Sequence, residues 1–147
     1  MAFDMTPILT TGQIEEFLAR EFPQIHANGP VFECIDVAPR TATLRFHPNE
    51  IHLRPGGTVS GPALFALADV AAYVALLAHI GPVALALTTN LTINFLNRAD
   101  LAPLDGVARI LKLGRSLAML EISIERTDTR TLIAHATATY SIPPAKA

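Results

Sequence analysis

Asp69 is the residue of this sequence whose type and setting point most clearly to chemistry. It is the one formally charged residue between positions 55 and 97, and it lies inside an apolar run over 63–80. A run that is apolar on every side is typical of a fully buried helix. A carboxylate in such a helix is unfavourable unless it has partners or gives up its charge. Asp69 is therefore a candidate general base or nucleophile; the alternative is a hydrogen-bonded aspartate that holds two helices together.

The start of this helix carries a second candidate group. Pro62 is suited to the first helical position, which would make Gly61 the N-cap. The amino end of a helix has unpaired N–H groups and a partial positive charge, so Gly61 is placed to bind a developing oxyanion. Asp69 lies eight residues further on, about 12 Å along the axis. A single substrate carbonyl cannot contact both groups of one helix, which predicts a dimer with sites at its interface.

These residues carry a resemblance to a known family. The pattern Gly-x-x-[HS]-Gly-x-x-x-x-x-Leu-x-Asp, followed by the strand-like TTNLTINFL, resembles the hotdog-fold acyl-CoA thioesterases of the phenylacetate-degradation type over residues 40–141. The resemblance implies an α+β hotdog fold, a long central helix wrapped by a curved antiparallel sheet. It implies one domain over 1–147, with 1–30 as an N-terminal helical arm. It also implies a homodimer with joined sheets and two shared active sites, and we expect a homotetramer.

The resemblance also implies roles for individual residues. The carboxylate of the family falls on Asp69, its oxyanion glycine on Gly61 and its strand hydroxyl on Thr88, which would orient water or the carboxylate. Two positions depart from the pattern, because Ser60 replaces the usual histidine and Arg54 the usual asparagine. Ser60 would cap the helix or contact substrate. Arg54 would pair with Asp69 or polarise the thioester oxygen, unless it is a solvated loop residue.

Coenzyme A would enter as part of the substrate, and no separate cofactor or metal is expected. The phosphates of coenzyme A need basic groups at the mouth of the cleft. Arg115 matches a position that is often basic in the family, with Arg98 and Lys112 as further candidates.

An apolar wall around Phe65, Val70 and Tyr73 favours an acyl or aryl group over a charged one. Asn90, on the polar side of the following strand, is a further candidate for substrate contact.

The most favoured function is hydrolysis of an acyl- or aroyl-CoA thioester, and two alternatives stay open. The departures at Ser60 and Arg54 would also fit a non-catalytic acyl-CoA binding module. His52, nine residues before Gly61, resembles the histidine of hotdog enoyl-thioester hydratases and dehydratases. Those enzymes place a glutamate near the position of Ala66, so the pair is incomplete here.

The elements that must position these groups follow from periodicity and turn signals. Cleanly alternating residues over 85–96 predict that Leu91, Ile93 and Phe95 pack on the helix, and that Thr88, Asn90, Thr92 and Asn94 point the other way, toward the subunit partner or the site. The alanines of the last strand, Ala134, Ala136 and Ala138, would let the sheet curl closely around the helix. We expect a helix over 10–20 that Thr11 caps and Pro23 ends, with Ile14, Phe17 and Leu18 as its apolar face, and strands over 31–37, 41–47, 85–96, 106–113, 117–126 and 131–141.

Composition excludes several classes of function. The net charge of −2 gives no case for nucleic acid. Cys34 is the only cysteine, so no internal disulfide can form; a buried thiol and a cytoplasmic location are expected. The first ten residues do not resemble a signal peptide.

A membrane span over 63–80 is disfavoured, because Asp69 at mid-membrane would cost about 3 kcal/mol. No histidine shows a zinc-like spacing.

Overall fold

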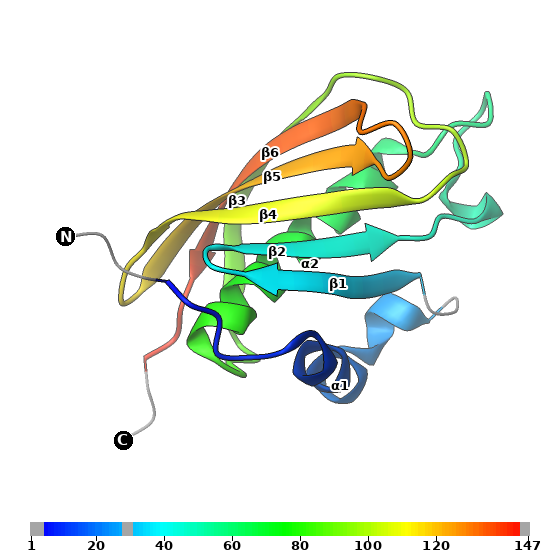
Figure 1. The fold of residues 1–147 in the computed structure, drawn as a ribbon. Helices are drawn as coiled ribbons and strands as arrows, with labels where there is room; N and C mark the ends of the chain where they lie inside the picture. Colours follow the sequence, from blue (N-terminus) through cyan, green and yellow to red (C-terminus); the bar gives the residue numbers. More distant parts are fainter. Residues whose placement is uncertain (1–4, 28–30, 145–147) are drawn as a thin grey trace.

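A six-stranded antiparallel sheet curves around one long helix, α2, which lies across its concave face (Figure 1). The computed structural model describes residues 5–27 and 31–144. The strand order is β1-β2-β4-β5-β6-β3, and the predicted α+β arrangement is confirmed. The elements are α1 (Thr11–Glu21), η1 (Pro23–His26), β1 (Phe32–Ala38), β2 (Thr41–Phe46), η2 (Glu50–His52), α2 (Gly61–Ile80), β3 (Leu87–Phe95), β4 (Leu104–Leu113), β5 (Leu117–Arg126) and β6 (Leu132–Ser141).

Helix α2 is apolar all round because other parts of the chain cover most of it. By length and mean hydropathy it would be able to cross a membrane, yet 78% of its most apolar window is buried in the structure. The sheet approaches it closely at Gly106 of β4, where an added Cβ would lie 3.1 Å from Leu67 Cδ1 and 3.2 Å from Ala71 Cβ. The apolar composition of this helix is therefore explained by its place in the core.

Small residues on β6 allow the same close wrapping, as the sequence predicted. Ala134, Ala136 and Ala138 are all buried against the core. Because alternate residues of a strand share a face, the next residue on this face is Tyr140, which is also buried. Its hydroxyl reaches the helix, as described below.

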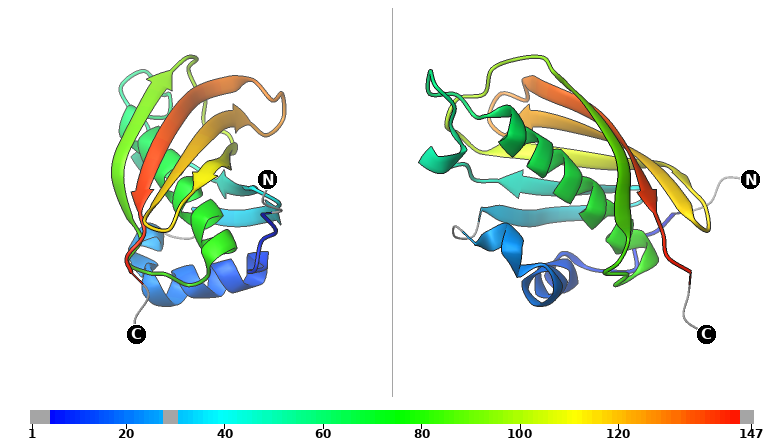
Figure 2. Two further views of the ribbon diagram at one scale, coloured as in Figure 1. Left: turned by 90° about the vertical axis from the view of Figure 1, so that its left-hand side faces the viewer. Right: turned by 180° about the vertical axis from the view of Figure 1, so that it is seen from behind.

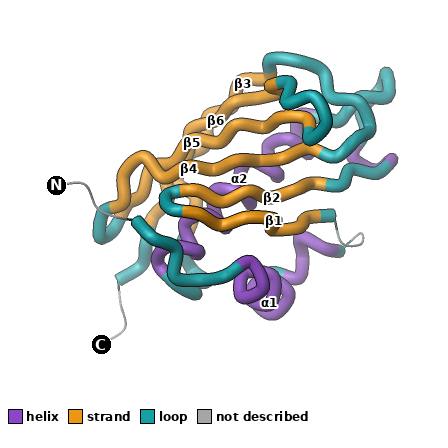
Figure 3. Tube along the Cα trace, in the orientation of Figure 1, coloured by secondary structure: helices purple, strands orange, loops and turns teal. Residues whose placement is uncertain are grey.

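The N-terminal arm covers one edge of the sheet. Helix α1 packs beside β1 and below the carboxyl end of α2, with η1 following it (Figures 2 and 3). Its predicted apolar face of Ile14, Phe17 and Leu18 is buried. Its cap is Thr10, not Thr11: the Thr10 hydroxyl accepts the Gln13 N–H at 3.1 Å.

Cys34 is buried in β1 beneath this arm, as predicted. Burial, reinforced by the negative charge of Glu15, raises the pKa of its thiol to about 12. The backbone N–H of Cys34 donates to the Glu15 carboxylate. Since a thiol with this pKa is not ionised at neutral pH, Cys34 acts as a small apolar core residue.

Candidate functional site

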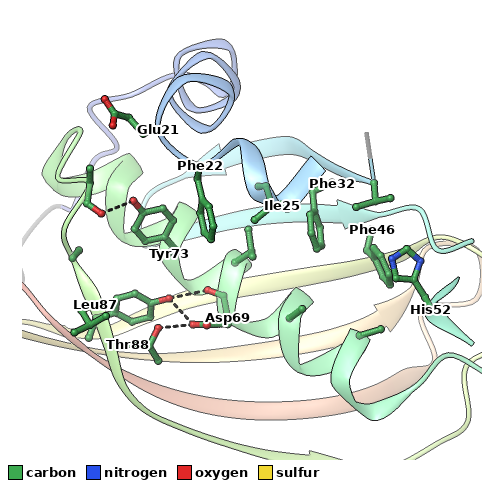
Figure 4. A pocket seen from close by; sticks show the side chains of 17 residues that line it. Glu21, Phe22, Ile25, Phe32, Phe46, His52, Asp69, Tyr73, Leu87 and Thr88 are labelled. Carbon is green, nitrogen blue, oxygen red and sulfur yellow. Dashed lines mark hydrogen bonds between the residues drawn. The ribbon is translucent and has the colours of Figure 1, made fainter. Parts of the chain in front are cut away.

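A cavity of about 590 Å³ runs along one side of α2, between the helix, the N-terminal arm and the strands (Figure 4). Most of its lining is apolar. The polar side chains among its lining residues are two carboxylates, three hydroxyls and one imidazole. The lining residues are Glu21, Phe22, Ile25, Val31, Phe32, Phe46, His52, Ala63, Ala66, Asp69, Val70, Tyr73, Ala84, Ala86, Leu87, Thr88 and Tyr140.

Two hydroxyl groups hold one oxygen of the Asp69 carboxylate. Asp69 Oδ1 accepts from Thr88 Oγ1 at 2.6 Å and from Tyr140 OH at 2.7 Å. The Tyr140 hydroxyl also lies 2.9 Å from the backbone oxygen of Asp69. Asp69 is half-buried, and its Oδ2 has no hydrogen-bond partner among the residues that the structure describes. The carboxylate is therefore fixed through one oxygen while the other is free to react.

Thr88 reaches Asp69 because of a β-bulge that the alternation pattern did not predict. In the pairing of β3 with β6, Thr88 lies opposite Tyr140 and Asn90 opposite Thr139, so Thr89 is the extra residue. One extra residue reverses the alternation. Thr88 therefore shares the helix-facing side with Leu91 and Ile93, and the prediction that it faces away from the helix is wrong.

Tyr140 is a residue of this candidate site that the sequence reasoning missed. Burial, and next the negative charge of Asp69, raise its pKa above the ordinary value, so the phenol stays protonated and donates. Its ring stacks on that of Tyr73 at 6.3 Å, and Tyr73 in turn donates its hydroxyl to the Ala84 oxygen at 2.9 Å. The sequence signal that could have identified Tyr140 is the two-residue alternation of the last strand. The face that carries Ala134, Ala136 and Ala138 continues to Tyr140.

Tyr140→Phe tests whether this phenol positions the carboxylate. We expect kcat to fall about 10- to 100-fold, the size of one lost hydrogen bond to a charged group. Steady-state rates at neutral pH measure the effect. Tyr73→Phe is the control, since its hydroxyl bonds Ala84; an equal fall in kcat in both variants would contradict the assignment.

The amino end of α2 lies at a second cavity, of about 410 Å³. Arg54, Gly61, Phe95 and Arg98 are among its lining residues. The N-cap of the helix is Ser60, whose hydroxyl accepts the Ala63 N–H at 3.3 Å. The prediction that Gly61 is the N-cap is therefore wrong by one position.

Gly61 is the first helical residue, and its N–H has no acceptor within the described chain. Arg54 and Asp69 lie in different cavities, so the predicted pairing of these two side chains does not occur within one chain. The Arg54 side chain is exposed beside Gly61 and Arg98.

The remaining predicted contacts fall in several places. Tyr73 lines the first cavity, as Val70 does, but Phe65 is 41% exposed on α2 and lies outside it. Asn90 is exposed, on the side of β3 that faces away from the helix. Arg115 is exposed in the β4–β5 turn. That turn lies at the end of the sheet where β3 begins, whereas Arg98 follows the end of β3.

His52 lines the same cavity as Asp69, near the amino end of α2 (Figure 4). Its Nδ1 accepts the Asn49 N–H at 2.9 Å, which leaves the proton of the neutral ring on Nε2. Burial lowers the pKa of this imidazole below its ordinary value. Ala66 lines the cavity too, but contributes no acid. Within the described ranges, no three His, Cys, Asp or Glu side chains gather closely enough to hold a metal ion.

The chain is similar in sequence and fold to known proteins. A family model described as the thioesterase superfamily matches residues 56–133. The crystal structure of a candidate thioesterase from Silicibacter sp. TM1040 has 42% sequence identity with this chain, covers 97% of each chain and gives a TM-score of 0.86. No curated protein matches the chain.

Two more distant structures show the same fold. Thioesterase superfamily member 2 from zebra fish is 22% identical, covers 92% of this chain and 99% of its own, and has a TM-score of 0.79. A point mutant of the phenylacetic acid degradation protein PaaI from Thermus thermophilus is 23% identical, covers 82% of this chain and 99% of its own, and has a TM-score of 0.71.

Proposed function

This chain belongs to the thioesterase superfamily and is a thioester hydrolase with the hotdog fold, and we propose that it hydrolyses acyl- or aroyl-CoA thioesters at sites shared by two subunits. One observation carries the proposal. The Asp69 carboxylate lies on the wall of an apolar cavity, with Oδ1 held by two hydroxyls and Oδ2 free. A carboxylate held in this way is suited to general-base or nucleophilic attack on an acyl group that fills the cavity.

A second subunit is proposed because one chain keeps the reacting groups apart. Asp69 lies about 12 Å along α2 from Gly61. Strand β3 ends one edge of the sheet and has no neighbouring strand on its outer side within the described chain. Strand β3 exposes the side chains of Leu87 and Phe95, which are 65% and 53% accessible. No element of the described chain covers the face of the amino-terminal half of α2 that is turned away from the sheet (Figure 2). These unpartnered apolar surfaces support pairing with a second copy.

Antiparallel pairing of two β3 strands would assemble the site. Thr88, at the start of β3, is bonded to Asp69, while the Phe95 ring, at its end, lies 3.5 Å from where a Cβ on Gly61 would be. Two antiparallel copies place the start of one strand opposite the end of the other. The Asp69 carboxylate of one subunit would then approach the Gly61 N–H of its partner.

The proposed reaction uses these groups in turn. As a base, Asp69 Oδ2 takes a proton from water while the water oxygen bonds to the thioester carbon. The partner's Gly61 N–H stabilises the oxyanion that forms. The C–S bond then breaks, and the leaving thiolate of coenzyme A takes up the proton held on Oδ2. As a nucleophile, Oδ2 would instead bond to the acyl carbon and expel the thiolate of coenzyme A. Water would then cleave the resulting mixed anhydride into the free acid and the Asp69 carboxylate. Arg54 and Arg98, exposed beside Gly61, would bind the anionic part of coenzyme A.

The direct test is the release of free thiol from a set of acyl- and aroyl-CoA thioesters, measured with a thiol reagent, together with binding measured by calorimetry. We expect turnover on at least one member. Tight binding without turnover would identify an acyl-CoA binding module instead. Hydration of an enoyl-CoA that disappears in His52→Ala but persists in Asp69→Asn would identify the hydratase alternative.

Mixed subunits test the shared site. Asp69→Asn removes the carboxylate, and Gly61→Val places a branched side chain at the oxyanion position, where a Cβ has ordinary contact distances. Each variant alone should be inactive. Because half of randomly mixed dimers are hybrids with one intact site, refolding the two together should recover about a quarter of wild-type activity. Circular dichroism and gel filtration of each variant provide the folding control. A mixture as inactive as its parents would place both groups of a site in one chain.

A further inference from the structure

The first cavity is elongated, and Asp69 does not lie at its end. On α2 its lining extends from Ala63 to Tyr73, with Asp69 between them (Figure 4). Asp69 lies six residues from Ala63, about 9 Å along the axis. The cavity therefore continues well beyond the carboxylate toward the amino end of the helix.

The two directions from Asp69 differ in the space they offer. Toward Tyr73, aromatic rings occupy the wall: Phe22 meets Tyr73 edge-on at 6.0 Å, and Tyr73 stacks on Tyr140. Toward Ala63, the helix contributes only the small side chains of Ala63 and Ala66. Measured along the helix, the longer part of the cavity is thus on the Ala63 side, six residues from Asp69 against four toward Tyr73.

The facing wall of that space is also apolar. It is formed by Ile25 of η1, Phe32 of β1 and Phe46 of β2. The rings of Phe32 and Phe46 stack at 5.3 Å, and His52 meets Phe46 edge-on at 4.8 Å. Burial lowers the pKa of His52, so this end carries no charge at neutral pH. Such a groove favours an uncharged acyl group, since a carboxylate there would be desolvated without a cationic partner.

Most of this wall precedes the residues that the family model matches. The superfamily match spans residues 56–133 and includes Asp69 and Thr88. Ile25, Phe32, Phe46 and His52 all precede it. The carboxylate and its threonine thus lie within the matched residues, whereas the wall that faces the acyl group is supplied by the N-terminal part of this chain.

We propose that the groove from Asp69 to His52 selects an uncharged, apolar acyl chain of about eight carbons, which passes between Ala66 and Ile25 on its opposite walls. A C–C bond of about 1.5 Å advances an extended chain by about 1.3 Å, so about eight carbons cover the distance from Asp69 to Ala63. The inference rests on the proposed function, because it assigns the acyl group of the same thioester substrate.

The test is the acyl-length profile of kcat/KM on acetyl-, butanoyl-, octanoyl-, dodecanoyl- and glutaryl-CoA. Each buried methylene adds about a factor of four, so octanoyl-CoA should exceed acetyl-CoA at least 100-fold. Glutaryl-CoA, which ends in a carboxylate, should rank with the short substrates. A wild-type profile that is flat or highest for acetyl-CoA would overturn the proposal.

Variants of the two walls should move the profile in opposite directions. Ala66→Leu adds three carbons to the groove and should lower the octanoyl-to-butanoyl ratio about 50-fold. Ile25→Ala removes three carbons and should raise the dodecanoyl-to-octanoyl ratio about 10-fold. The matched control is Ala19→Leu, the same substitution on an exposed position of α1 outside the cavity.

The outcomes separate this inference from the function on which it depends. If the wild type hydrolyses none of these substrates, nor any aroyl-CoA, the proposed function fails. If it hydrolyses them but Ala66→Leu and Ile25→Ala keep the wild-type ratios, the groove assignment alone fails. Gel filtration of Ala66→Leu identifies any loss of activity that follows from loss of assembly, and Ile25→Ala, on the opposite wall, still decides the assignment in that case.

Discussion

Asp69→Asn should lower kcat for thioester hydrolysis at least about 1,000-fold, because it removes the base or nucleophile of the reaction. The amide keeps an oxygen that accepts hydrogen bonds, so Thr88 and Tyr140 retain an acceptor in the position of Oδ1. The variant should therefore fold and bind substrate much as the wild type does. Stopped-flow detection of thiol release, with calorimetry on the same substrate, measures both properties.

The matched control is Asp100→Asn, at an exposed position outside both cavities. A fall in kcat shared by the two variants, or turnover by Asp69→Asn within tenfold of the wild type, would contradict the catalytic role. Rapid acid quench of a single turnover, followed by mass spectrometry, separates the two mechanisms. Only the nucleophilic route adds the mass of the acyl group to the wild-type protein.

Asp105→Ala should lower the free energy of unfolding by about 2–3 kcal/mol, because it removes a buried carboxylate that accepts hydrogen bonds from two arginines. The Asp105 side chain is 1% exposed, although it lies on the outer side of the sheet. Arg45 binds it with two nitrogens at 2.8 and 3.1 Å, and Arg130 adds a third contact at 3.0 Å. Its loss removes these three contacts, whereas the Arg45 and Arg130 side chains, 30% and 59% exposed, remain accessible to water. Urea unfolding, followed by circular dichroism, measures the change.

Asp128→Ala is the comparison for that experiment. Asp128 also pairs with an arginine, Arg126, at 2.8 Å, but its side chain is 57% exposed. The hydrogen bond from Arg126 lowers the pKa of the Asp128 carboxyl. Because exposed pairs contribute little to stability, the midpoint of unfolding should barely move. Equal effects of the two substitutions would show that burial of Asp105 is not what makes its ion pairs matter.

The sequence predicted the central features because they are local. The long apolar run, the lone carboxylate and the Gly-Pro start of the helix are visible in consecutive residues. These features predicted the helix α2, a cavity that Asp69 faces, and the amino end of the helix as a second candidate reactive group. Helix ends were less secure: Ser60, not Gly61, caps α2, since serine and glycine both suit this position.

The sequence by itself determined that a buried helix would carry one acid, because hydrophobic periodicity and an isolated charge are properties of neighbouring residues. Only the tertiary structure decided what surrounds that acid. The bulge at Thr89, which turns Thr88 toward Asp69, is a property of how β3 pairs with β6. Tyr140 lies 71 residues from Asp69, and the arm reaches the cavity from the other end of the chain. These contacts arise when distant strands and helices pack, so no short stretch of sequence contains them.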